Sequence, residues 1–302
     1  YVRGTLDNTG GTLDATTTSL HGLTLNGATI HGGTLKQVDL GLTFASHAGN
    51  TLDGVTVVGD LAVNAGSIAI SGGTTVLNAA GNAPGVITAS NGAVITIRDA
   101  AAVTMDQSIT LSSSTLTADK PGNGVQDLAI GAAGEVHGSG NITDQQFGYS
   151  DAVNLDNLGT IGADAAGQTL NIATTGFVNY GLAAATNGGT LAIESNTGRA
   201  WSNAAGGTLS ETNSTLVLSG PFANHGQVTA TGGTLSLDGT FNFGQPTTWT
   251  NDGTITGSNA AIVIAGNETV SDIGVINRSG GSLTYVRGTL DNTGGTLDAT
   301  TT

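Results

Sequence analysis

The chain has 302 residues, of which 49 are glycine, 10% are charged and 38% are apolar in short Val, Ile and Leu runs, a spacing that argues against disorder. Its 22 acidic residues outnumber 7 Lys and Arg, and the formal net charge of −15 opposes binding to nucleic acid or to an anionic membrane. Cysteine is absent, which excludes disulfides and thiolate metal sites, and no apolar run approaches the length that spans a bilayer.

The first segment of the chain occurs twice. Residues 1–18 read YVRGTLDNTGGTLDATTT, and residues 285–302 repeat them letter for letter. Structural constraint preserves a pattern but lets exposed residues drift, so identity at every position indicates a tandem duplication. We therefore predict a single solenoid unit over 1–302, in which 1–284 is one period of an array and 285–302 begins the next copy.

Short apolar runs bounded by Gly, Asn or Asp follow along the chain. They are typical of short β-strands separated by tight turns. Apolar spacing at 3, 4 and 7 residues is missing, so we expect little helix. Two stretches fit poorly, 40–50 and 117–150, and are expected to form a longer loop or a distorted coil. The clearest runs are 67–70, 94–97, 234–237 and 261–264.

Two short sequence words recur between these runs. The first, Gly-Gly-Thr/Ser-Leu, begins at Gly10, Gly32, Gly188, Gly206, Gly232, Gly280 and Gly294. The second places a large apolar residue two positions before an asparagine. Its asparagines include Asn8, Asn157, Asn179, Asn203, Asn224, Asn251 and Asn277. From Asn157 onward these asparagines are spaced by 22, 24, 21, 27 and 26 residues, a period that indicates a solenoid.

This period predicts an all-β fold, a parallel β-helix with about 20–27 residues per coil. With about 13 coils stacked about 4.8 Å apart, one period would rise about 60 Å. The asparagines are expected at a repeated corner, where their amides hydrogen-bond along the axis. The apolar residues before them are expected to point inward as a stack of Leu155, Phe177, Trp201, Phe222, Trp249 and Val275.

The Asn-x-Gly corners, the Gly-Gly-Thr-Leu words and the low charge together resemble the shafts of large bacterial surface proteins. The nearest are filamentous-haemagglutinin-like exoproteins and autotransporter-type adhesin passengers. The resemblance covers nearly the whole chain and implies an elongated, right-handed parallel β-helix at the bacterial cell surface. It carries over no binding residue. The long identical period departs from such shafts and favours a dedicated fibre-building block.

Candidate catalytic groups are sparse. A polysaccharide hydrolase or lyase on this scaffold needs clustered carboxylates, often with a basic partner. The closest acidic groupings are Asp39, Asp53 and Asp60 and, beside the second irregular stretch, Asp144 and Asp151. None has a basic partner in a recognisable pattern, so we expect exposed acids at turns. His21 and His31 lie ten residues apart without a third ligand, so no metal site is predicted.

The sequence therefore predicts a structural protein without catalytic, cofactor or metal sites. We expect it to be a repeat unit of an extracellular bacterial fibre, surface filament or adhesin stalk, whose partners are further copies joined end to end. A cell-surface glycan or other cells are the further expected partners. The alternatives are a carbohydrate-active β-helix enzyme and a glycan-binding adhesin, for which 117–150 is the expected contact region.

Overall fold

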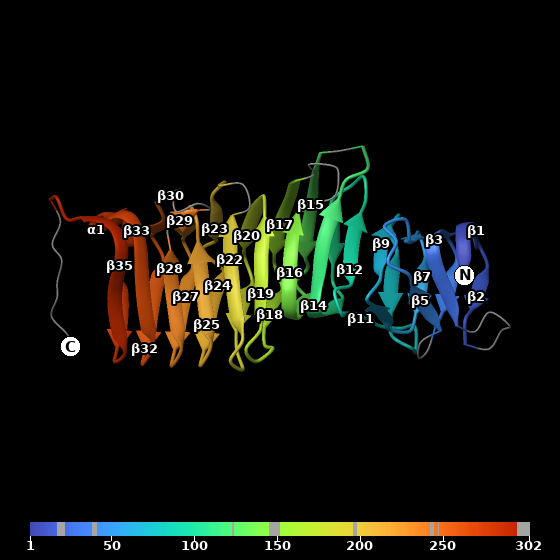
Figure 1. Cartoon of the computed structure of the whole chain (residues 1–302), viewed down its shortest axis with the longest axis horizontal. Helices are drawn as coiled ribbons and strands as arrows, with labels where there is room; N and C mark the ends of the chain where they lie inside the picture. The colour runs from blue at the N-terminus through green and yellow to red at the C-terminus, as the bar shows by residue number, and fades with distance from the viewer. Residues whose placement is uncertain are drawn as a thin grey trace. The chain divides into compact units, whose positions relative to one another are not determined.

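The computed structural model describes residues 1–16, 22–37, 41–122, 124–144, 152–195, 198–238, 240–241, 245–246 and 248–294. It is all-β, with 63% strand and 2% helix, and its parallel strands form a β-solenoid of about 12 turns. The predicted fold class is confirmed. The chain forms two compact units, Tyr1–Val153 and Asn154–Thr302, and the division falls inside strand β17 (Ala152–Asn157). Within each unit the strands lie side by side in chain order (Figure 1).

In the first unit, each coil adds strands to the largest sheet, here called the principal sheet. It also adds a short strand to one of the smaller parallel sheets, which together are here called the third face. The principal strands are β1 (Val2–Asp7), β3 (Leu23–His31), β5 (Leu42–Phe44), β6 (Thr51–Asp53), β8 (Leu61–Asn64), β9 (Ser67–Ser71), β11 (Val86–Ser90), β12 (Val94–Arg98), β14 (Ser108–Asp119) and β16 (Glu135–Asp144). The third face holds β2 (Thr12–Asp14), β4 (Thr34–Lys36), β7 (Thr56–Val58) and β10 (Thr75–Leu77) in one sheet, and β13 (Val103–Met105) and β15 (Val125–Ile130) in another.

The second unit repeats this plan. Its principal strands are β18 (Thr160–Ala163), β19 (Thr169–Thr174), β21 (Leu182–Ala185), β22 (Thr190–Ser195), β24 (Thr208–Thr212), β25 (Thr215–Ser219), β27 (Gln227–Thr231), β28 (Thr234–Asp238), β32 (Thr254–Ser258), β33 (Ala261–Thr269), β34 (Ile276–Ser279) and β35 (Ser282–Asp291). The third face holds β17, β20 (Gly176–Asn179), β23 (Trp201–Asn203), β26 (Phe222–Asn224) and β31 (Thr250–Asn251). A short antiparallel pair, β29 (Thr240–Phe241) and β30 (Gln245–Pro246), and one helix, α1 (Val270–Ile273), complete the unit.

Alternation along the strands fills the interior of the coils. Leu191 pairs with Leu216 on the next coil, and Leu216 pairs with Leu235 on the one after, and all three are fully buried. Each such side chain contributes about 1.5–3 kcal/mol by leaving water. Stacking equivalent residues thus builds columns of apolar side chains inside the second unit.

One corner of the coil recurs as a left-handed residue between two principal strands. Asn187, Asn213 and Asn259 adopt φ of 55°, 48° and 51° at this corner. Asparagine tolerates this conformation better than most residues, whereas a β-branched residue would be strained there. The asparagines of these turns therefore form the corners at which the chain changes direction within each coil, so that the coils can stack.

The irregular stretch predicted over 117–150 is mostly regular. Strand β14 extends to Asp119, and β15 and β16 cover most of the stretch up to Asp144, while 145–150 lie outside the described residues. Several of the glycines that suggested a loop are required by close backbone contact. A Cβ at Gly138 would lie 2.0 Å from the carbonyl oxygen of Leu111 on the preceding coil. In the shorter stretch, 40–50, strand β5 forms from Leu42 to Phe44.

Candidate functional site

Buried asparagines form a ladder along the third face of the second unit. Asn157, Asn179, Asn203, Asn224 and Asn251 end successive strands, and each is at most 5% exposed. The Nδ2 of each donates to the Oδ1 of the next, at 2.7, 2.8, 2.8 and 2.7 Å in chain order. The spacings predicted from the sequence, 21–27 residues, are therefore the coil lengths in this unit.

The ladder amides also bind the backbone. Asn157 donates to the carbonyl oxygen of Leu182 at 2.9 Å, and Asn179 donates to that of Thr208 at 3.1 Å. Buried polar groups are costly unless they are paired. A shift of one coil by one residue would leave amides unpaired in the interior, so the ladder fixes the register between coils.

Large apolar side chains stack beside the ladder. Leu155, Phe177, Trp201, Phe222 and Trp249 are each at most 3% exposed. The rings of Trp201 and Phe222 stack with centroids 4.7 Å apart and planes 16° apart, and those of Phe222 and Trp249 stack at 5.3 Å and 3°. Each aromatic pair contributes about 0.5–1.5 kcal/mol beyond its buried area.

Val275 and Asn277 do not continue the stack and the ladder, so their predicted places were wrong. Val275 is 68% exposed, and Asn277 is an exposed residue of β34 that pairs with Thr256 in the principal sheet. Helix α1 takes the position on the third face instead, and Asn251 Nδ2 donates to the carbonyl oxygen of Ile273 at 3.1 Å.

A capping box starts this helix. The Thr269 side chain accepts from the backbone N–H of Asp272, and the Asp272 carboxylate accepts from the backbone N–H of Thr269. The spacing Thr-x-x-Asp before an apolar residue was a readable signal for it.

Asn8 also stands apart from the ladder. It follows β1 in the first unit, and its Nδ2 donates to the carbonyl oxygen of Thr34 at 3.1 Å.

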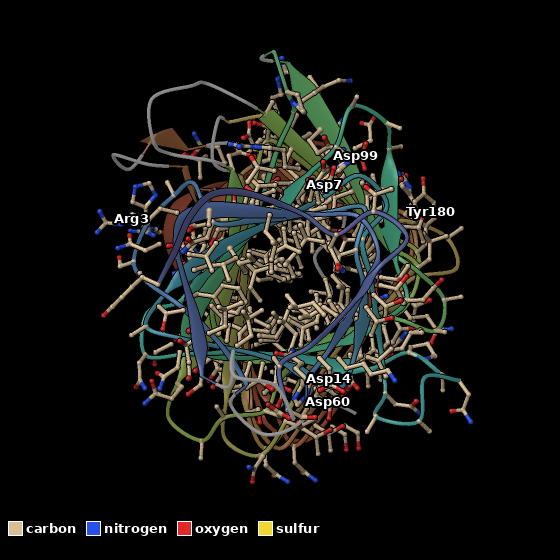
Figure 2. The ribbon with its side chains drawn as sticks, turned by 90° about the vertical axis from the view of Figure 1, so that its right-hand side faces the viewer. Arg3, Asp7, Asp14, Asp60, Asp99 and Tyr180 are labelled. Atoms are coloured by element: carbon tan, nitrogen blue, oxygen red, sulfur yellow. The ribbon has the colours of Figure 1, made fainter. Side chains whose placement is uncertain are left out.

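Each candidate acidic residue that the structure describes, Asp53, Asp60 and Asp144, has a separate partner. Asp53 Oδ2 lies 2.7 Å from His31 Nδ1, and the Asp60 Oδ1 accepts from the backbone N–H of Val86 at 2.9 Å. Asp144 Oδ1 accepts from the backbone N–H of Val153 at 2.9 Å. Figure 2 shows the labelled carboxylates, among them Asp60, on the outside of the coils. The other candidates, Asp39, Asp151 and His21, lie outside the described residues.

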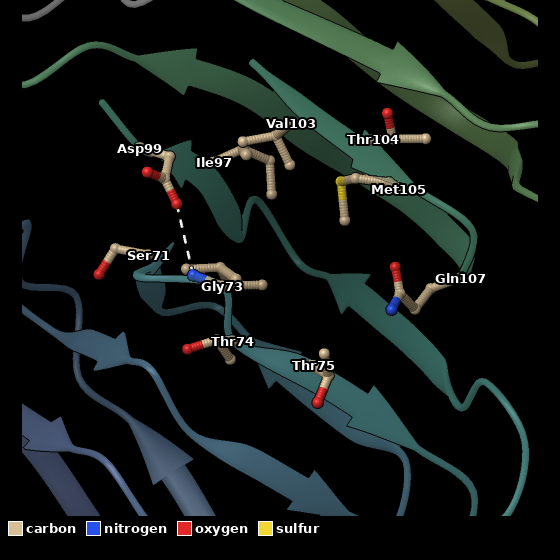
Figure 3. A pocket seen from close by; sticks show the side chains of 11 residues that line it. Ser71, Gly73, Thr74, Thr75, Ile97, Asp99, Val103, Thr104, Met105 and Gln107 are labelled. Atoms are coloured by element: carbon tan, nitrogen blue, oxygen red, sulfur yellow. Dashed lines mark hydrogen bonds between the residues drawn. The ribbon is translucent and has the colours of Figure 1, made fainter. Parts of the chain in front are cut away.

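A pocket of about 200 Å³ opens in the first unit where the third face passes from β10 to β13 (Figure 3). Its one carboxylate, Asp99, accepts from the backbone N–H of Gly73 at 3.3 Å. Acid–base catalysis by carboxylates needs a second group of matched chemistry. The rest of the lining is apolar or uncharged: Ile70, Ser71, Gly73, Thr74, Thr75, Ile97, Val103, Thr104, Met105 and Gln107.

Three buried carboxyl groups, Asp119, Glu211 and Glu268, escaped the sequence analysis. Arg98 and Asp119 pair across neighbouring strands, and Asp119 is 6% exposed. Their spacing of 21 residues, one coil, was the available signal. Glu211 is 1% exposed, and its carboxylate accepts from the backbone N–H groups of Ser214 at 3.1 Å and Gly233 at 3.2 Å. Burial raises the pKa of Glu211 despite these bonds.

Glu268 is the most perturbed of these groups. It is 1% exposed, and both carboxylate oxygens lie 3.3 Å from the backbone nitrogen of Trp249. The pKa of Glu268 is raised to about 7, chiefly by burial; the Trp249 N–H opposes this rise, and the charge of Asp272 adds to it. Within the described residues, no three His, Cys, Asp or Glu side chains gather to hold a metal ion. Its burial places the Glu268 carboxyl group in the core of the second unit.

This pKa predicts that the contribution of Glu268 to the stability of the second unit is largest in acid. In the unfolded chain Glu268 has its ordinary pKa of 4.5, so between 4.5 and about 7 the folded state keeps a proton that the unfolded state has released. The free energy of unfolding should fall as the pH rises through this window, by about 3 kcal/mol. Guanidinium unfolding of the chain and of Glu268→Gln at several pH values measures it. Glutamine keeps an acceptor for Trp249, so equal pH dependence in the two proteins would contradict the assignment.

No family model matches the sequence, and neither a curated protein nor a solved structure is significantly similar to it. In the part of the chain that is described, no helix has the length and apolar character needed to cross a membrane. The class of the protein is therefore set by its fold, a parallel β-solenoid.

Proposed function

We propose that this chain is a structural repeat unit of an extracellular bacterial fibre, such as a surface filament or an adhesin stalk. The observation that carries the proposal is the identity of 1–18 and 285–302, joined with a fold in which coils stack one on another. The open face of a coil offers unpaired strand edges. In a tandem array, each copy covers the edge that the preceding copy leaves open.

The proposed role is mechanical. Backbone hydrogen bonds between parallel strands run along the stack, and the asparagine ladder and the aromatic stack hold neighbouring coils in register. Without the repeated segment, which holds Arg287, Asp291 and Asp298, the 7 basic and 22 acidic residues become 6 and 20, a net charge of −14 per period. Repulsion between such units opposes lateral clumping of fibres.

Location at the bacterial surface rests on the resemblance to adhesin shafts. The lack of cysteine is compatible with secretion as a long fibre. The rival carbohydrate-active enzyme gives no reason for an identical segment of 18 residues, and a glycan-binding adhesin lies between that enzyme and the fibre unit. The test below includes results that would favour these rival functions.

The test is the length of the rod as copies are added. Chains of one, two and three periods are imaged by electron microscopy, beside filaments sheared from the producing cells. About 12 turns at about 4.8 Å predict that each period adds about 60 Å. Compact particles whose length does not grow with copy number would overturn the proposal. Release of reducing ends from a polysaccharide by the purified chain would favour the enzyme instead.

A further inference from the structure

The repeated segment has a different strand partner at each of its two positions. At 2–7 it is β1, which pairs with β3, a strand that comes later in the chain. At 287–291 it is the end of β35, which pairs with β33, a strand that comes earlier. The same sequence therefore pairs with two different neighbours: the later neighbour, β3, at the first position and the earlier neighbour, β33, at the second.

Contacts to the earlier neighbour appear at the second position. The hydroxyl group of Tyr285 donates to the carbonyl oxygen of Gly266 at 2.6 Å. Arg287 Nη2 lies 2.8 Å from Asp238 Oδ2, two coils back along the column Asp238–Ala265–Arg287. At the first position the same two residue types face solvent, since Tyr1 is 88% exposed and Arg3 projects away from the coils in Figure 2.

The glycine of the segment fits the same neighbour. Gly288 has φ of 98°, and a Cβ there would lie 1.8 Å from the carbonyl oxygen of Gly266. Gly4 has φ of 85°, but a Cβ there would meet nothing within 4 Å. The close approach that excludes a side chain thus exists at the second position and is absent at the first.

Contacts to the later neighbour appear at the first position. Leu6 pairs with Ile30, which is fully buried, and Asp7 pairs with His31. Asn8 Nδ2 donates to the carbonyl oxygen of Thr34 at 3.1 Å. At the second position the equivalent asparagine, Asn292, is exposed. The asparagine of the segment is therefore bound by the later neighbour at the first position and exposed at the second.

The two neighbours occupy opposite edges of the strand. The backbone N–H of Asn8 donates to the carbonyl oxygen of His31 at 2.8 Å. The backbone N–H of Thr289, the counterpart of Thr5, donates to Asn267 Oδ1 at 3.0 Å. In a parallel sheet, successive N–H groups point to alternate edges, so positions three residues apart point to opposite edges. Both neighbours can therefore bind one strand at once.

We infer that in the array this segment is a shared strand, held on one edge by β33 of one copy and on the other by β3 of the next. The inference deepens the proposed function and rests on it. At each junction the arginine equivalent to Arg3 pairs with Asp238 of the preceding copy, and the tyrosine equivalent to Tyr1 bonds its Gly266. The partner of each copy is thus the first coil of another copy, in a register that these contacts define.

The test uses the burial of the shared strand's leucine. Leu6 and Leu290 are both half-buried. In the column that starts at Leu6, the next two residues, Ile30 and Leu52, are fully buried. The chain has no cysteine, so a single Leu→Cys substitution gives a unique thiol. It is placed at Leu6 or Leu290 of this chain, and at the junction leucine of a chain of two periods. Reaction with a thiol reagent should be at least about tenfold slower at the junction, because it then needs local opening.

A junction thiol as reactive as the thiols at Leu6 and Leu290 would overturn the inference. Circular dichroism of each variant shows whether the β fold is kept. If the cysteine variants fail to fold, Arg287→Ala and Arg3→Ala give a second test. In this chain, Arg287→Ala should lower the midpoint of guanidinium unfolding, whereas Arg3→Ala should leave it unchanged. Equal shifts of the midpoint in the two variants would contradict the ion pair across the junction. A protected thiol without filaments on cells would contradict the fibre function and leave the shared strand standing.

Discussion

Replacing Trp249 with alanine should destabilise the second unit by about 3–5 kcal/mol, the usual cost of deleting a buried indole. The side chain is fully buried at the end of the aromatic stack, with Phe222 parallel to it. Alanine removes the stacking and leaves a cavity beside Phe222 of β26 that a close-packed interior cannot fill. The shift of the guanidinium midpoint, multiplied by the slope of the transition, measures the loss.

Trp249→Phe is the matched control. Phenylalanine keeps a ring against Phe222 and removes the indole Nε1–H, which is buried without a hydrogen-bond partner among the described residues. The lost area is then partly offset because no unpaired donor stays buried. We expect a cost below about 1.5 kcal/mol. If phenylalanine and alanine destabilise the protein equally, ring stacking is not what Trp249 contributes.

Asn203→Ala should cost about 3 kcal/mol, because it interrupts the ladder in the middle. Asn179 Nδ2 loses an acceptor at 2.8 Å, and Asn224 Oδ1 loses a donor at 2.8 Å. Both groups stay buried, and each unpaired buried polar group costs about 1–3 kcal/mol. Guanidinium unfolding followed by circular dichroism gives the change in free energy.

Asn277→Ala is the control for the ladder. Both asparagines belong to the same sequence word, but Asn277 is exposed and lies on the principal sheet. Its replacement should change stability by less than about 0.5 kcal/mol. A large loss at Asn277, or a negligible one at Asn203, would show that burial in the ladder is not what distinguishes them.

The sequence was most informative where one word repeats at one structural position. From Asn157 to Asn251 an apolar residue precedes each asparagine by two positions, and these asparagines form the ladder. The sequence word wrongly predicted that Asn277 continues the ladder, because a local helix signal precedes it. The capping box of Thr269 and Asp272 starts a helix, which takes the place of the expected third-face strand.

The buried charges were not predicted because pairing across coils depends on coil length, which varies along the chain. Arg98 meets Asp119 after 21 residues, whereas Asn224 meets Asn251 after 27. A fixed period therefore misplaces side chains by several residues within a few coils. Glu211 was hidden for another reason. It occupies an inward column between Ala185 and Ala230, where small neighbours leave room for its carboxylate to reach two backbone N–H groups.

The ladder also has a direction. Every amide donates to the following coil, and the last, Asn251, donates to the carbonyl oxygen of Ile273. At the other end, Asn157 Oδ1 is buried and accepts no hydrogen bond from the described residues. Rotating one amide by half a turn would set two NH₂ groups against each other on one side and two oxygens on the other. The amides cannot reverse together either, because Asn157, Asn179 and Asn251 also donate to backbone carbonyl oxygens. Their aligned dipoles therefore give this corner a common electrical polarity.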